Sequence, residues 1–151
     1  QAWDGAKRRS LARSLCVMKN EVIENSDLAG RTEFIEGIKS CFPESLQEMF
    51  DLEDELLHID MGNFARTTVN AIQSEDKKLF QAHFDFISDL FSKANPELEN
   101  AINVSYLENV FLGETDSKFT EAREFLPDNL KKALVGLEEH LEKLHEASKN
   151  T

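Results

Sequence analysis

The 151-residue chain is 40% hydrophobic and 30% charged, with a formal net charge of −12. This length favours a single domain, and the apolar content excludes an intrinsically disordered chain. The charge is uneven, at +4 over residues 1–19 and −16 over residues 20–151. Such an acidic body repels phosphate backbones and attracts basic surfaces, so we expect a basic protein partner and no direct binding of nucleic acid.

Helix-forming residues dominate the composition, whereas Gly (6) and Pro (3) are scarce. Strand-like runs separated by turn residues are missing, and no run reaches the roughly 18 apolar residues of a membrane span. We therefore predict an all-α fold, in which residues 1–151 form one compact bundle of about seven or eight short helices. No membrane contact is expected.

Three helices are predicted in the N-terminal third of the chain. The first covers about residues 4–24 and is basic; it could be peripheral, and the residues before Met18 could be additions to a chain that starts there. The second covers about residues 31–41. Pro43 separates it from the third, about residues 44–57, because proline fits a first helical turn but not a helix interior.

The middle of the chain is predicted to hold the core. A helix that begins at Gly62 or Asn63 covers about residues 64–73, and Ser74 is expected to cap the next helix, about residues 75–94. Apolar residues cover more than half the circumference of this second helix. We predict that it is the central and most buried element.

Three further helices are predicted, over about residues 97–111, 117–126 and 128–147, with a loop between the first two. Phe119 and Phe125 are expected to face inward. The last helix carries leucines at 4-3-4-3 spacing, which is typical of a coiled-coil seam. Two heptads are too few to imply dimerisation, so we expect the seam to pack on its own domain and the protein to be a monomer.

The two cysteines, Cys16 and Cys41, are too few for a disulfide framework and too far apart in sequence for a metal-binding knuckle. We interpret them as buried or idle thiols in a reducing compartment. Cytoplasmic localisation is the resulting prediction.

Phosphate-binding loops, nucleophile elbows and H-E-x-x-H motifs are absent from the sequence. Two E-x-x-H motifs, Glu55/His58 and Glu142/His145, have the spacing of di-iron carboxylate ligands. Such motifs arise by chance in a chain with 19 Glu, and the second lies in a charged terminus without an apolar shell. His83, on the Phe-rich helix, is interpreted as a core histidine. We predict no enzyme activity and no cofactor or metal; a di-metal carboxylate enzyme is the second alternative.

The densest acidic run extends from Asp51 to Asp60. Such a run is ordinarily a solvated helix face, but Leu52 and Ile59 within it could anchor a contact. A second acidic group lies in the loop before Ser117. The candidate partner-binding residues are therefore Asp51, Glu53, Asp54, Glu55 and Asp60, with Glu114 and Asp116 in the loop.

Residues 61–111, about a third of the chain, contain a characteristic series of helix-boundary and helix-packing motifs. It has a D-x-x-x-F entry into a helix, an acidic cap before an aromatic helix, and a closing N-A-I-x-V-S-[YF]-L-E-N segment. This pattern is similar to that of small bacterial immunity proteins encoded beside polymorphic toxins, including those of contact-dependent growth inhibition systems. The residues that carry it are Asp60, Phe64, Glu75, Asp76, Phe84, Phe86 and Asn100 to Asn109.

The resemblance implies a helical protein that neutralises a toxin, and several such proteins are partners of EndoU-type ribonucleases. A nuclease groove is positive because it holds phosphates, and an acidic helical surface could occupy it. The leading hypothesis is a cytoplasmic immunity protein that binds a cognate basic toxin, a ribonuclease, and occludes its active site or substrate groove stoichiometrically. The alternative is a generic acidic helical adaptor or regulatory domain.

Overall fold

The computed structural model describes residues 28–47 and 56–149, so the predicted helix over residues 4–24 lies outside the described part. Within it the chain is helical and no strand is present; Ala29 and Ala94 form an isolated bridge. The all-α prediction is confirmed. The helices are α2 (Arg31–Cys41), η1 (Pro43–Gln47, 3-10), α3 (Leu57–Gln73), α4 (Lys77–Ser92), α5 (Pro96–Ala101), η3 (Ile102–Leu107, π), α6 (Glu108–Phe111), α7 (Ser117–Arg123) and α8 (Asp128–Lys149).

Segments α5, η3 and α6 follow one another without a break and form a single helix with a π-helical middle. Counted in this way, the described residues contain six α-helices, so the predicted number of seven or eight is slightly too high. None of these helices is both long and apolar enough to cross a membrane.

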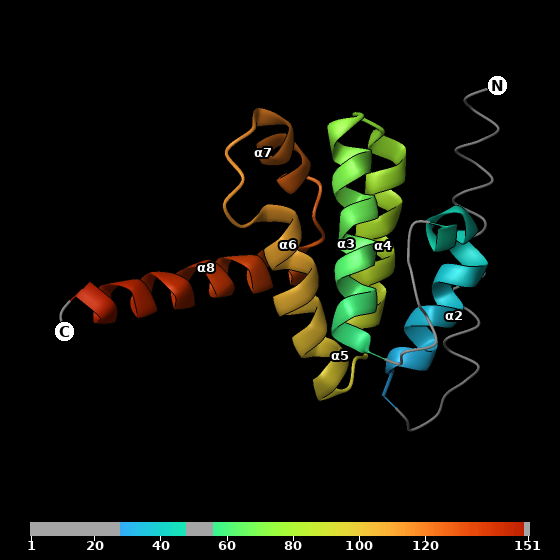
Figure 1. Cartoon of the computed structure of the whole chain (residues 1–151), viewed down its shortest axis with the longest axis horizontal. Coiled ribbons are helices and arrows are strands. Elements are labelled where there is room, and N and C mark those ends of the chain that lie inside the picture. Colours follow the sequence, from blue (N-terminus) through green and yellow to red (C-terminus); the bar gives the residue numbers. More distant parts are fainter. Residues whose placement is uncertain (1–27, 48–55, 150–151) are drawn as a thin grey trace.

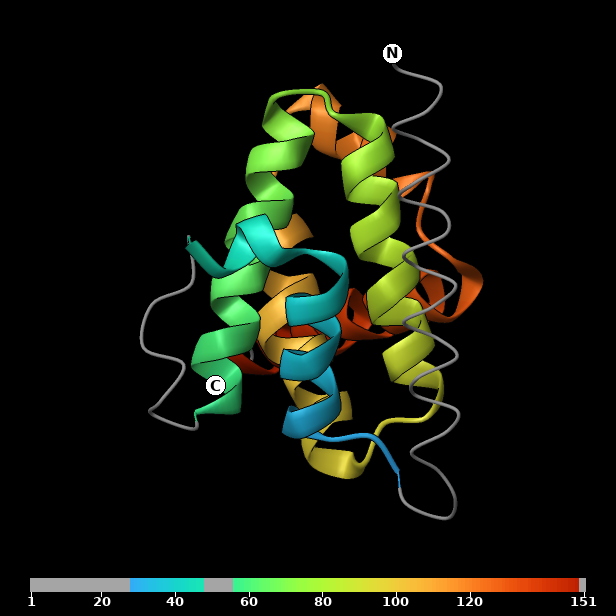
Figure 2. The ribbon, with the colours of Figure 1, turned by 90° about the vertical axis from the view of Figure 1, so that its right-hand side faces the viewer.

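The helices α3 and α4 form an antiparallel pair that lies between α2 on one side and the continuous α5–α6 helix on the other (Figure 1). Figure 2 shows α2 in front of the pair, running roughly along the two helices. At one end of the pair α7 packs against α3, while α8 packs against α4 and η3. The C-terminal part of α8 projects from this body (Figure 1).

The most central helix is α3 rather than α4, so the prediction for residues 75–94 is wrong on this point. Helix α3 packs against α4, α7 and the whole of the α5–α6 helix. Its buried face includes small residues, among them Ala65, Thr68 and Ala71, which let neighbouring helices approach closely. Hydrophobicity alone ranks these residues below the phenylalanines of α4, which is why the sequence favoured the wrong helix.

Two helix boundaries differ from the prediction. Gly62 lies inside α3, which begins at Leu57. Ser74 is the C-cap of α3, and the N-cap of α4 is Asp76, whose carboxylate accepts the backbone N–H of Leu79 at 3.2 Å. The helix predicted over residues 44–57 is represented by the short η1 in the described part.

The π segment explains the burial pattern of the α5–α6 helix. A regular helix that buries Leu98 and Ile102 would also bury position 109. Instead Asn109 is exposed, while Val110 and Phe111 are buried. The wider turn at Ile102–Leu107 shifts the phase of the later residues, so that the apolar face stays directed at α3.

The core contains a cluster of aromatic rings from four helical elements and the segment after α2. His83 is part of this cluster: it is 1% exposed, and its Nδ1 lies 2.8 Å from Thr68 Oγ1. The prediction of a core histidine is confirmed. The cluster consists of Phe34, Phe42, Phe64, Phe86, Tyr106 and His83.

The leucine seam of α8 packs on the domain only in its first half. Leu130 and Leu134 are fully buried, whereas Leu141 and Leu144 are 39% and 53% exposed. The prediction that the seam packs on its own domain is therefore correct for the first half and wrong for the second.

Cys41, in the last turn of α2, is half-buried and disulfide-bonded. The prediction of an idle thiol is therefore wrong at Cys41, whereas Cys16 lies outside the described residues.

Because α2 packs closely on α4, we expect replacement of Gly37 by alanine to destabilise the protein, although alanine normally stabilises a helix. A Cβ atom there would overlap the buried ring of Phe86, which neighbouring rings hold in place. Overpacking typically costs about 1–3 kcal/mol, and we expect Gly37→Ala to lower the free energy of unfolding by that amount. At Gly136, where a Cβ would meet nothing, Ala should instead raise it by about 0.5–1 kcal/mol.

Urea unfolding followed by far-UV circular dichroism measures both variants against the unmodified protein. If Gly37→Ala proved as stabilising as Gly136→Ala, the close approach of α2 and α4 would be refuted.

Candidate functional site

The structure separates the residues predicted to bind a partner into three groups. Asp51, Glu53, Asp54 and Glu55 lie outside the described residues. Asp60 is buried, at 1% exposure. The remaining two, Glu114 and Asp116, lie exposed in the loop before α7.

Asp60 forms an ion pair inside the fold. Its Oδ2 accepts a hydrogen bond from Arg31 Nε at 2.9 Å, and the two side chains are 2% and 26% exposed. This contact joins the start of α2 to the first turn of α3. A buried carboxylate needs such a partner to offset the cost of leaving water. The prediction of a partner-binding role for Asp60 is therefore wrong, because its carboxylate serves the fold.

The loop before α7 keeps its carboxylates at the surface. Asp116 is the N-cap of α7, and its Oδ1 accepts the backbone N–H of Lys118 at 2.9 Å. Glu114 is exposed one residue after Gly113, which has a φ of 83° that favours glycine. Loop and helix together present acidic side chains on one edge of the molecule.

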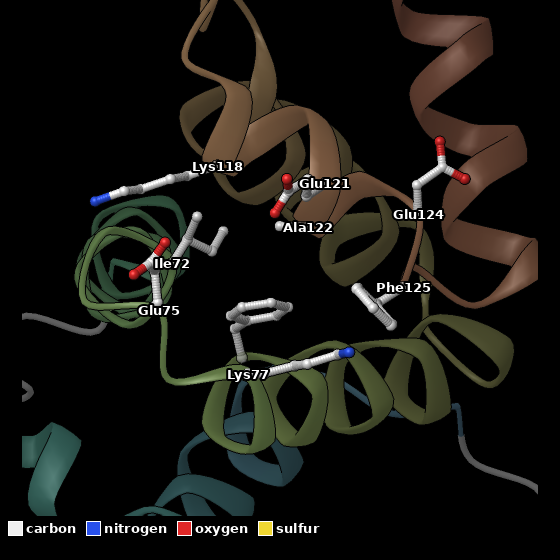
Figure 3. Close-up of a pocket in the computed structure, with 9 residues that line it drawn as sticks. Ile72, Glu75, Lys77, Lys118, Glu121, Ala122, Glu124 and Phe125 are labelled. Atoms are coloured by element: carbon white, nitrogen blue, oxygen red, sulfur yellow. The ribbon is translucent and has the colours of Figure 1, made fainter.

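A pocket of about 390 Å³ lies between α7 and the turn that joins α3 to α4 (Figure 3). Apolar side chains form part of its wall, and charged side chains surround them. Its lining residues are Ile72, Glu75, Lys77, Phe80, Lys118, Glu121, Ala122, Glu124 and Phe125.

The α3–α4 turn has an unusual backbone that shapes one wall of the pocket. Glu75 has a φ of 60°, in the left-handed region that residues other than glycine seldom adopt. The next residue, Asp76, caps α4. Phe80 then follows in the first turn of α4, with its ring centroid 6.1 Å from that of Phe125. The turn thus brings an aromatic side chain of α4 against the residues that follow α7.

The opposite wall, α7, is fixed on two sides. Lys118 Nζ donates a hydrogen bond to the carbonyl oxygen of Gln73 at 3.0 Å, which ties α7 to the end of α3. Arg123 forms a two-fold contact with Glu138 of α8, at 2.8 and 2.5 Å. Hydrogen bonding between these two groups raises the pKa of Arg123 and lowers the pKa of Glu138. These contacts hold α7 against α3 and α8.

The charged side chains of the pocket that form no ion pair are mainly glutamates. Among the ion pairs of the described residues, none involves Glu75 or Glu121, whereas the charge of Glu124 interacts with Arg123 and helps to raise its pKa. Both lysines are engaged: Lys118 binds Gln73, and Lys77 Nζ lies 4.1 Å from the ring centroid of Phe125. An apolar wall with unpaired carboxylates suits a cationic group that also carries apolar surface.

Phe125 is the largest departure from the prediction at this site. The sequence predicts that Phe125 faces inward with Phe119, which is indeed buried. Phe125 instead lies after the end of α7 and is 37% exposed, where it lines the pocket. The sequence contains no direct signal for the pocket, because its two walls are some 45 residues apart along the chain.

A second cavity, of about 210 Å³, reaches the aromatic cluster at His83. Behind it, Thr68 Oγ1 links His83 Nδ1 with the hydroxyl of Tyr106, at 2.8 and 2.9 Å. Burial raises the pKa of Tyr106, and the hydrogen bond with Thr68 lowers it by a smaller amount. The neutral phenol is thus held in the core, where it supports packing.

The two E-x-x-H motifs do not form one site in the described structure. Glu55 lies outside the described residues, and His58 Nδ1 lies 2.7 Å from Ser105 Oγ. Glu142 and His145 lie exposed on the part of α8 that projects from the body (Figure 1). The described residues contain no group of three His, Cys, Asp or Glu side chains that could hold a metal ion.

The described residues form an all-α fold with a pocket lined by apolar side chains, three glutamates and two lysines. Residues 35–142 match the family described as "Domain of unknown function (DUF7674)", and the chain belongs to that family. Over 66 residues, or 44% of the chain, it is 38% identical to the UPF0122 protein OB1530 of Oceanobacillus iheyensis. The chain spans 60% of the length of that relative. No solved structure matches the chain.

Proposed function

We propose that the protein is an immunity protein, which binds a cognate basic toxin and neutralises it by occluding the active site or substrate groove. The toxin is a ribonuclease of the kind used in contact-dependent growth inhibition. The observation that carries the proposal is the pocket beside α7, where Glu75 and Glu121 have no ion-pair partner in the described part. Binding, not catalysis, is the activity.

Charge supports the same proposal at longer range. A net charge of −12 attracts a basic surface and speeds association, most strongly at low salt. The exposed carboxylates of Glu114 and Asp116 lead directly into α7, so the predicted acidic loop and the pocket belong to one end of the molecule. A toxin that spans this end would contact both features.

Cytoplasmic action is part of the proposal, because a ribonuclease toxin meets its substrate there. The disulfide at Cys41 counts against it, since such bonds are rare in reducing compartments. Counting the free thiols of the protein isolated from its host distinguishes a reducing from an oxidising compartment. Two free thiols support cytoplasmic action, and none would argue for an oxidising compartment.

One observation favours the alternative of a helical adaptor. The second half of α8 leaves Leu141 and Leu144 exposed on a helix that projects from the body. Amphipathic helices of this kind can dock into a groove of another protein. Replacing both leucines by Asp should abolish binding to an adaptor partner, whereas toxin neutralisation should persist.

The acidic run provides the test of the proposed function. Changing four of its five carboxylates to Lys should slow association with the cognate toxin. A reversed rim charge affects mainly the on-rate, and a buried pair would cost about 2–5 kcal/mol of binding free energy. The difference should shrink at high salt, where exposed charges are screened. The variant changes Asp51, Glu53, Asp54 and Glu55.

The control variant reverses the same number of exposed carboxylates elsewhere, and circular dichroism verifies folding of both proteins. Its association rate should fall much less than that of the first variant. If affinity is independent of salt and equal in both variants, electrostatic capture by the acidic run is wrong. The control residues are Glu97, Glu139, Glu142 and Glu146.

A further inference from the structure

We propose that the pocket between α7 and the α3–α4 turn binds an arginine side chain presented by the partner protein. This inference rests on the proposed function in one respect, since it takes the partner to be basic. It adds the residue type and the place at which the partner is held.

The size of the pocket fits a single side chain. Its volume of about 390 Å³ lies near the lower end of the range of about 300–1,000 Å³ for ligand pockets. Interface hot spots are often arginines that occupy preformed pockets of this kind. The contacts of Lys118 and Arg123 already hold the α7 wall in place.

The structure itself places a cation on the aromatic wall. Lys77 Nζ lies 4.1 Å from the ring centroid of Phe125, which is within the range of a cation–π contact. At an exposed site such a contact is weak, so an incoming cation can replace it. A guanidinium group stacks on aromatic rings and is less strongly hydrated than an ammonium group. Arginine therefore fits this wall better than a second lysine.

Carboxylates approach the same space from two elements. Figure 3 shows Glu75 on the α3–α4 turn and Glu121 on α7, with Ile72 and Ala122 between them. Neither glutamate has an ion-pair partner among the described residues. The planar guanidinium carries five N–H donors and can bind carboxylates through paired hydrogen bonds. A phosphate or another anion would instead be repelled.

A titration of the full-length, 15N-labelled protein with N-acetyl-arginine amide tests the inference. We expect saturable shift changes confined to the amides of residues 72–80 and 117–125. N-acetyl-citrulline amide, which has the same shape without the charge, should bind at least about tenfold more weakly, since the charge-assisted contacts are lost.

Two sets of variants sharpen the result. Changing Glu75 and Glu121 to Gln should weaken binding of the arginine probe about fivefold or more, whereas the matched change of Glu139 and Glu142 on α8 should leave it unaltered. Lys77→Gln should strengthen binding severalfold, because the resident cation leaves the Phe125 ring.

The control for Lys77→Gln is Lys149→Gln, which removes one exposed positive charge from the C-terminal end of α8 and should change nothing. Equal binding of the arginine and citrulline probes, shift changes outside the pocket, or weaker binding by Lys77→Gln would overturn the inference.

The proposed function and the pocket can fail separately. If Glu75→Gln/Glu121→Gln neutralises the toxin as well as the unmodified protein does, the pocket is not where the partner is held, although the protein remains an immunity protein. If no toxin is bound but the arginine probe behaves as expected, the pocket recognises arginine and the proposed function is wrong.

Discussion

Replacement of Phe64 by alanine is expected to lower the free energy of unfolding by about 3–5 kcal/mol, the range for large-to-small changes in a core. The side chain is fully buried in the middle of α3. Ring centroids of five other residues lie 4.7–5.9 Å from its own. Neighbours packed this closely cannot collapse into the space left behind, so the cavity penalty should approach its upper range. The surrounding rings are Phe34, Phe42, His83, Phe86 and Tyr106.

The measurement is urea unfolding, with Phe125→Ala as the matched control. Phe125 is 37% exposed and lies at the rim of the pocket, so its loss should cost less than about 1 kcal/mol. Equal losses for both variants would mean that the aromatic cluster is not the centre of the fold.

Local signals predicted some helices well. The helix over residues 31–41 has the predicted boundaries, and the helix over residues 97–111 differs by one residue at its start. Each has a boundary set by short-range chemistry. Asn95 accepts the backbone N–H of Leu98 as an N-cap, with Pro96 directly after it. Caps and prolines act within a few residues, so a sequence reveals them directly.

The start of α3 shows where local signals fail. The sequence predicts a helix boundary at Gly62, but glycine inside a helix costs only about 1 kcal/mol relative to alanine. Burial of Leu57 and Met61, which are 3% and 0% exposed, contributes about 1.5–3 kcal/mol for each side chain. Tertiary packing therefore extends the helix past its glycine. The balance depends on neighbours that the local sequence does not specify.

The candidate site was predictable only in its charge. The acidic excess pointed to a basic partner, and Glu114 and Asp116 are indeed exposed. The pocket depends on a long-range meeting of α7 with the α3–α4 turn, through Lys118 and the carbonyl of Gln73. No pattern within either segment indicates that contact. Asp60 shows the opposite error, because a carboxylate in an acidic run proved to be a buried partner of Arg31.

Alkaline unfolding provides a second large effect, which is centred on Tyr106. This residue is fully buried, and burial raises the pKa of its phenol above the ordinary value of about 10. Above that pH the unfolded chain releases the proton, whereas the folded protein retains it. Stability is therefore fully present below pH 10 and should then fall by up to about 1.4 kcal/mol for each further pH unit.

The spectrum reports this residue alone, because the chain contains a single tyrosine. Phenolate absorbance should stay absent above pH 10 until far-UV circular dichroism shows unfolding, and both signals should then change together. Phenolate that forms near pH 10 in a protein with unchanged circular dichroism would show that Tyr106 is not buried.

Tyr106→Phe separates this residue from other groups that titrate at high pH, such as the lysines. At neutral pH the variant should be less stable by about 1 kcal/mol, because it loses the hydrogen bond with Thr68. Above about pH 10 its stability should fall less steeply, since no phenol remains to ionise in the unfolded chain. The two stability curves should therefore converge and cross within about one pH unit above pH 10, a reversal of order that the loss of a hydrogen bond alone would not produce.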